Sequence, residues 1–160
     1  MNAKHLGTYV NDHLAGSVAA LELLDHMISA NAGTPRGQFF IELRQEIEQD
    51  QAALRDLLEQ LDFKENPMRK AAAWFSEKLA RAKLSMEDPR GDKLARLEKL
   101  EALTLGIEGK RALWRSLNVI ADRAPALQAM DLTGLEQRAA EQRQRIEAFR
   151  LDVAREAFDG

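Results

Sequence analysis

The sequence predicts an all-α fold, and three observations support this prediction. The composition is rich in Ala, Leu, Glu, Arg and Gln, which are strong helix formers. The four prolines all lie between stretches of helical periodicity, where a residue without an N–H group is tolerated. No stretch alternates β-branched and polar residues as a half-buried strand would. A length of 160 residues corresponds to one domain, so we expect residues 1–160 to form a single helical unit.

Turn signals divide the chain into five expected helices. Pro35 closes the polar link that follows the first helix, and Pro67 opens the third helix after an N-cap residue, Asn66. Pro89 follows the third helix and Pro125 follows the fourth. The expected helices span residues 4–31, 36–62, 67–84, 92–123 and 131–158.

The lengths of these helices and links predict a bundle. Four of the helices would each be about 40 Å long at 1.5 Å per residue. The short links after the first and fourth helices favour two antiparallel hairpins. The connection between Asp62 and Gly91 carries its own shorter helix and is long enough to cross the bundle. We therefore expect an antiparallel four-helix bundle with a long crossover.

The apolar stripes of these helices are interrupted near their centres by polar residues. Asp50 interrupts the apolar stripe of helix 36–62. Lys110 or Arg111 interrupts the stripe of helix 92–123, and Gln142 interrupts the stripe of helix 131–158. Folding the hairpins about their links brings these positions to one level. The arc of helix 4–31 adds His13 and Ser17 at about the same height, with Tyr9 one turn from His13. A buried carboxylate needs a cationic partner, so we predict a mid-bundle polar network, which is also a candidate ligand-binding site, formed by His13, Ser17, Asp50, Lys110 or Arg111, Gln142 and Tyr9.

This plan resembles the ferritin-like superfamily over nearly the whole chain. Di-iron members of that superfamily hold two metals at mid-bundle with Glu and Glu-x-x-His motifs. The present sequence has no Glu-x-x-His motif, and its three histidines, His5, His13 and His26, all lie in the first helix. Residues 8–16 and 100–114 also resemble segments of a small family of uncharacterised bacterial helical proteins. The resemblance therefore implies the ferritin-like fold, and the missing motif implies that the di-iron centre is absent.

The functional expectation is a non-catalytic protein without a cofactor that binds a small ligand or a protein partner. No Ser-His-Asp arrangement or nucleotide fingerprint is present. The alternative is a metal-dependent oxidoreductase or iron-handling protein with an atypical iron or manganese site. Its ligands would be drawn from His13, Glu46, Asp50, Glu101 and Glu108.

Two glycines inside the fourth helix need a reason, because each costs about 1 kcal/mol relative to alanine. Gly106 and Gly109, together with Gly16 and Ala20 of the first helix, either let two helices approach closely or leave room for a ligand at the polar layer. The sequence leaves both explanations open.

Charge and composition set the expected partners and location. The formal net charge of -3 gives no general attraction to nucleic acid or to an anionic membrane. No apolar run is long enough to cross a bilayer and no leader sequence is recognised, so we expect a soluble cytoplasmic protein. The apolar arc of helix 4–31 is broader than one inward seam requires, which predicts a homodimer.

Overall fold

The computed structural model of the protein describes residues 2–65 and 93–159, and all regular structure in these ranges is helical. The all-α prediction is confirmed for this part of the chain. The helix predicted over 67–84 lies outside the described residues. The elements are α1 (Ala3–Ala30), α2 (Pro35–Gln60), α4 (Lys93–Val119), the 3-10 helix η2 (Ala121–Arg123), α5 (Pro125–Gln128) and α6 (Leu132–Phe158).

Side-chain caps explain where three of the helices begin. The side chain of Asn2 accepts a hydrogen bond from the backbone N–H of His5 at the start of α1. Thr34 caps α2 in the same way, with Pro35 in the first turn, and Asp131 caps α6. These caps satisfy N–H groups that have no partner within their own helix.

The helix predicted over 92–123 ends earlier than expected. α4 stops at Val119, and the chain continues through η2 into the short helix α5, which Pro125 opens. Leu127 of α5 is fully buried, so this link is anchored in the core instead of forming a simple loop. A four-residue helix is too short to leave a periodic pattern in the sequence.

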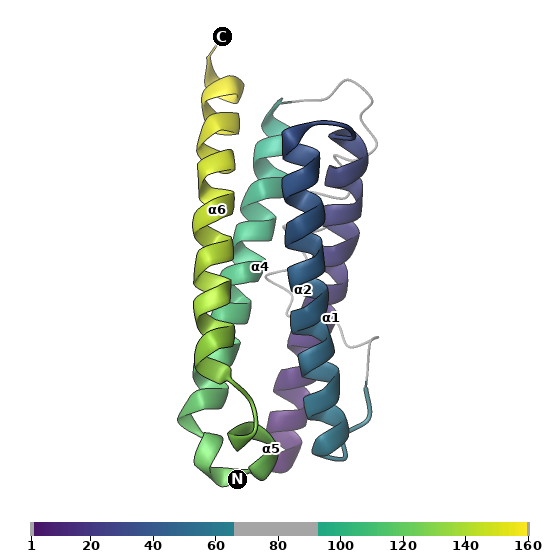
Figure 1. Cartoon of the computed structure of the whole chain (residues 1–160), viewed down its shortest axis with the longest axis vertical. Helices are drawn as coiled ribbons and strands as arrows, with labels where there is room; N and C mark the ends of the chain where they lie inside the picture. The colour runs from purple at the N-terminus through teal and green to yellow at the C-terminus, as the bar shows by residue number, and fades with distance from the viewer. Residues whose placement is uncertain (1, 66–92, 160) are drawn as a thin grey trace.

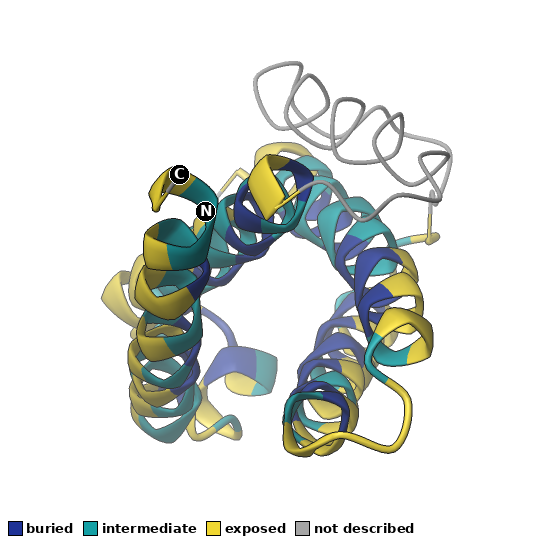
Figure 2. Ribbon diagram, turned by 90° about the horizontal axis from the view of Figure 1, so that it is seen from above, coloured by how far each residue is buried: buried dark blue, intermediate teal, exposed yellow. Residues whose placement is uncertain are grey.

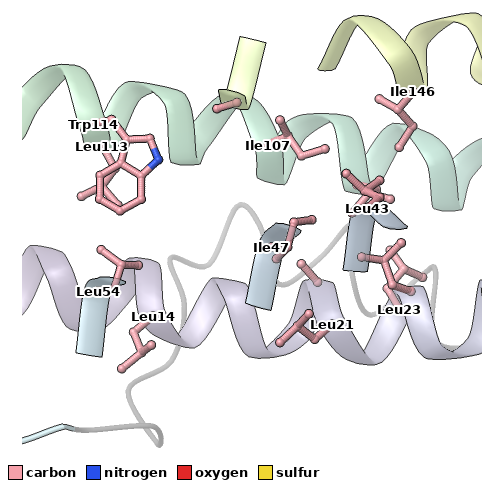
Figure 3. Close-up of a cluster of buried hydrophobic side chains, with 14 of the residues drawn as sticks. Leu14, Leu21, Leu23, Leu43, Ile47, Leu54, Ile107, Leu113, Trp114 and Ile146 are labelled. Carbon is pink, nitrogen blue, oxygen red and sulfur yellow. The ribbon is translucent and has the colours of Figure 1, made fainter. Parts of the chain in front are cut away.

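The long helices of the described part lie lengthwise beside one another, with α5 at one end (Figure 1). α1 packs along α2, α4 packs along α6, and α1 also contacts α4. Viewed from above, the buried residues of these helices face the interior (Figure 2). In the close-up of the core, buried leucines and isoleucines from the long helices face a shared interior, and Leu113 lies beside the buried Trp114 at one end of the view (Figure 3).

The apolar arc of α1 is used inside the chain. Val10, Leu14 and Leu24 are buried where α1 packs against its neighbours. Contacts with both α2 and α4 account for much of the breadth of the arc, and Tyr9, Val18 and Ile28 stay partly exposed. No helix in the described ranges combines the length and apolar character needed to cross a bilayer.

Candidate functional site

A buried ion pair lies at the centre of the long helices. The ammonium group of Lys110 on α4 donates to Oδ2 of Asp50 on α2 and to Oε1 of Gln142 on α6, both at 2.5 Å. Asp50 is only 1% exposed. Its other oxygen accepts a hydrogen bond from the guanidinium of Arg138 on α6. The carboxylate therefore has the partners that a buried charge requires.

A second carboxylate extends this network. Glu46 lies one turn before Asp50 on α2 and accepts hydrogen bonds from Gln142 at 2.9 Å and from Arg145 at 2.5 Å. The amide of Gln142 accepts from Lys110, the partner of Asp50, and donates to Glu46. It thereby links the Asp50–Lys110 pair to the second carboxylate. We call Glu46, Asp50, Lys110, Arg138, Gln142 and Arg145 the central network.

The electrostatics of the central network differ between its groups. Burial by itself would raise the pKa of Glu46, but hydrogen bonds from Arg145 and Gln142 and nearby positive charges lower it overall. Burial lowers the pKa of Lys110, and the negative charge of Asp50 opposes that shift. Two carboxylates face three cations, so the network carries a formal charge of +1 when all are ionised.

Lys110, and not Arg111, faces the core. The side chain of Lys110 is 12% exposed, whereas the Arg111 guanidinium lies 3.6 Å from Glu108 and 3.5 Å from Glu136 toward the surface. Successive residues on a helix are about 100° apart, so only one of the two can point inward. Arg111 is therefore removed from the predicted polar layer.

Tyr9, His13 and Ser17 do not join the central network. Ser17 donates to the carbonyl of Leu14 at 2.6 Å and accepts from Gln51 at 2.8 Å. The Tyr9 ring contacts His13 edge to face at 4.7 Å, and its hydroxyl donates to Ser116. Within the described residues no hydrogen bond joins His13 to Asp50, so the single predicted layer is divided into two adjoining groups.

The second group lines a cavity between α1 and α4. The cavity has a volume of about 250 Å³ and a mostly apolar wall. Tyr9, His13 and Ser17 lie on the α1 side, and Lys110 links the cavity to the central network. We call it the α1–α4 cavity; its lining also includes Asp12, Gly16, Ala20, Ile47, Leu105, Gly106, Ile107, Gly109 and Leu113.

The helix glycines keep this cavity open. A Cβ atom built on Gly16 or on Gly109 would meet no atom within 4 Å. Close helix approach, one of the two explanations left open by the sequence, is therefore wrong at these two positions. The other explanation, space beside the polar layer, fits both of them, because Gly16, Gly106 and Gly109 all line the cavity.

The four carboxylates of the alternative metal site are each paired with a cation. Glu101 lies 3.7 Å from Arg150, and Glu108 pairs with Arg111 and with Arg143. In residues 2–65 and 93–159, no group of three or more potential ligands converges on one point. Because Lys110 and Arg138 already hold the carboxylate of Asp50, the donor set does not fit a ferritin-type dinuclear centre.

Three partners of these groups were not predicted from the sequence. Arg138 and Arg145 belong to the central network, and Gln51 donates to Ser17 beside the cavity. Arg138 lies four residues before Gln142, on the same face of α6, and this spacing was a usable signal. Arg145 lies three residues after Gln142 and reaches Glu46. Long arginine side chains bring their charge inward from flanking positions, which a stripe of apolar residues does not reveal.

Comparisons with protein-family models, curated protein sequences and solved structures found no match to this chain.

Proposed function

We propose that the protein is a non-catalytic small-ligand-binding protein and that the α1–α4 cavity is its binding site. The open space beside Gly16 and Gly109 carries this proposal. Glycine inside a helix costs about 1 kcal/mol relative to alanine, and here no neighbouring atom requires the missing side chain. Glycine at both positions leaves space in the cavity for a ligand.

The lining indicates the chemistry of the ligand. Most of the wall is apolar, which suits a small hydrocarbon or aromatic body. Two of the three N–H groups of Lys110 donate to Asp50 and Gln142, so among the described residues a third is left for a ligand. The favoured ligand is a small, mostly apolar molecule with one hydrogen-bond acceptor, such as a carbonyl or carboxylate.

The wider proposal is a ferritin-like, antiparallel four-helix bundle in which the central network replaces a metal centre. The pairing of α1 with α2 and of α4 with α6 supports this arrangement. Hydrogen bonds that join α2, α4 and α6 at mid-helix support the replacement. Elemental analysis of protein purified without chelators separates this proposal from the metal-dependent alternative, because near-stoichiometric iron or manganese would favour the alternative.

A homodimer in the cytoplasm remains part of the proposal. Since most of the α1 arc packs within the chain, a dimer would draw mainly on other surfaces. Sedimentation equilibrium at several protein concentrations tests the dimer directly.

Ligand-observed NMR tests the binding proposal. Phenylacetate and acetophenone join an aromatic body to a charged and a neutral acceptor, and saturation transfer to either probe is expected with the wild-type protein. Gly109→Leu fills the cavity and should abolish transfer, because the probe and the new side chain compete for one volume. Ala52→Leu places the same leucine side chain on the exposed side of α2 and is the control. Equal transfer with Gly109→Leu and Ala52→Leu would contradict the proposal.

A further inference from the structure

A second cavity lies near the end of the molecule where α1 meets α2, distant from the α1–α4 cavity. It is formed by the last turns of α1, the first turns of α2 and α4, and the last turns of α6, and its volume is about 90 Å³. Phe40 and Phe149 form part of an apolar floor. Arg36, Arg96, Lys99 and His26 line the same small space, so basic groups from three helices surround it.

Two of these basic groups already hold a carboxylate between them. The guanidinium of Arg36 lies 2.8 Å from Oε1 of Glu156, and that of Arg96 lies 3.9 Å from Oε2. The two arginines come from α2 and α4, yet they reach the two oxygens of one group on α6. The two guanidinium groups are therefore near enough to each other to face one oxyanion.

The positive charge around this cavity exceeds the negative charge. Among the described residues that line this cavity or pair with its lining, Arg36, Arg96 and Lys99 contribute three positive charges and Glu156 one negative charge, which gives a surplus of +2. Within the described residues no carboxylate lies within ion-pair distance of Lys99. Lys99 is half-buried, and this burial lowers its pKa, so its charge lacks the compensation that Lys110 receives from Asp50.

We propose that this second cavity binds a phosphate group, either free or carried by a small organic molecule. A phosphomonoester carries about -1.5 to -2 charges at pH 7, so it would neutralise more of the charge of Arg36, Arg96 and Lys99 than the single carboxylate of Glu156 does. Guanidinium groups bind phosphate oxygens through paired N–H donors, and lysine adds a point charge. The volume admits a compact anion, and the aromatic floor accommodates a small apolar substituent.

Glu156 occupies the anion-binding groups when phosphate is absent. Its carboxylate is tied to Arg36 and lies in the last turn of α6, with the side chain 41% exposed. The carboxylate of Glu156 can rotate into solvent at little cost, because exposed surface ion pairs contribute little to stability. A phosphate dianion would then replace one negative charge with nearly two at the same guanidinium groups.

Isothermal titration with inorganic phosphate and with phenyl phosphate, at constant ionic strength, tests this proposal on the full chain. Saturable binding is expected with at least one of the two. Lys99→Gln should weaken it about tenfold, because one charge-assisted contact is removed. Arg115→Gln is the matched control, since it removes one positive charge from an exposed position on α4 about 24 Å along the helix.

Glu156→Gln provides a gain-of-affinity test that does not depend on removing a binding group. Loss of the competing carboxylate should strengthen phosphate binding about threefold to tenfold. Tighter binding of phenyl phosphate than of inorganic phosphate would identify an organic phosphate as the natural class, and equal binding would identify the free anion. Absence of saturable binding to both probes, equal effects of Lys99→Gln and Arg115→Gln, or weaker binding in Glu156→Gln would each overturn the proposal.

Discussion

Lys110 and Asp50 lie 60 positions apart in the sequence and meet at a hydrogen-bond distance of 2.5 Å inside the protein. Removing two charges from water is costly, and mutual attraction offsets this cost only where further hydrogen bonds complete the site. Gln142 supplies one of these bonds to Lys110, and Arg138 supplies one to Asp50. Removal of either member of the pair should therefore destabilise the protein more than the loss of an ordinary contact would.

The first prediction concerns Asp50→Ala, which leaves the Lys110 ammonium buried without its counter-charge. The free energy of unfolding should fall by about 3–5 kcal/mol in urea denaturation. Asp152→Ala is the control, because Asp152 forms an exposed ion pair with Arg155 and its loss should cost about 0.5 kcal/mol or less. A loss of similar size in both variants would show that the Asp50–Lys110 pair is not a buried charge pair.

The second prediction compares removal of one charge of the Asp50–Lys110 pair with replacement of both charges by apolar side chains. Lys110→Met alone should destabilise the protein strongly, because Asp50 then keeps only Arg138 as a cationic partner. In the double variant Asp50→Leu with Lys110→Met, both buried charges are replaced by apolar groups, and the free energy of unfolding should recover to within about 1–2 kcal/mol of wild type. A double-mutant cycle in urea measures this coupling, and strictly additive losses would argue against it.

The third prediction contrasts two helix glycines. Gly109→Ala should raise the free energy of unfolding by about 1 kcal/mol, because the new methyl group meets no atom within 4 Å. Gly7→Ala should lower it, because a Cβ there would lie 2.9 Å from the ring of Phe63. Thermal and urea unfolding of the two variants provide the comparison. A gain at both positions would mean that the Phe63 ring moves aside freely.

The fourth prediction is a pH dependence of stability caused by His13. Burial lowers the pKa of His13 below 6.5, and the charge of Asp12 opposes this shift only in part. Below pH 6.5 the unfolded chain therefore takes up the proton before the folded protein does, and the free energy of unfolding decreases as the pH falls through that window. Above pH 6.5 this contribution is fully present.

His13→Gln should reduce the decrease in melting temperature between about pH 7.5 and about pH 5. His26→Gln replaces an exposed histidine on the same helix and should leave the wild-type pH profile nearly unchanged. Identical profiles for wild type and His13→Gln would show that another group causes the dependence.

The sequence was sufficient to predict that α2, α4 and α6 meet through polar residues, whereas His13 and Ser17 of α1, predicted in the same layer, lie in the adjoining group. Asp50 and Gln142 each interrupt an otherwise apolar stripe, and both are buried at the centre of the structure. Such interruptions are informative because an unpaired polar group in a core is costly and therefore requires a partner. The choice between Lys110 and Arg111 was not available from the sequence, since the stripe of α4 admits either of two neighbouring positions.

Other parts of the site depend on information that the sequence does not carry. A glycine in the sequence is consistent both with a closely packed neighbouring helix and with empty space. Only the coordinates separate these two explanations for Gly16 and Gly109. Arg138 and Arg145 lie at the flanks of the α6 stripe, and the length of their side chains determines where their charges reach. The end of α4 and the short α5 follow from the burial of Leu127, which is a tertiary effect.

The central network also determines how the helices are aligned along their length. Leucines repeated every three or four residues would pack almost as well if one helix slid past another by a full turn, about 5.4 Å. Such a slip would separate Lys110 from Asp50 and Gln142, which come from different helices. A few polar side chains therefore act as a longitudinal lock that selects one alignment among several that hydrophobic packing alone would tolerate.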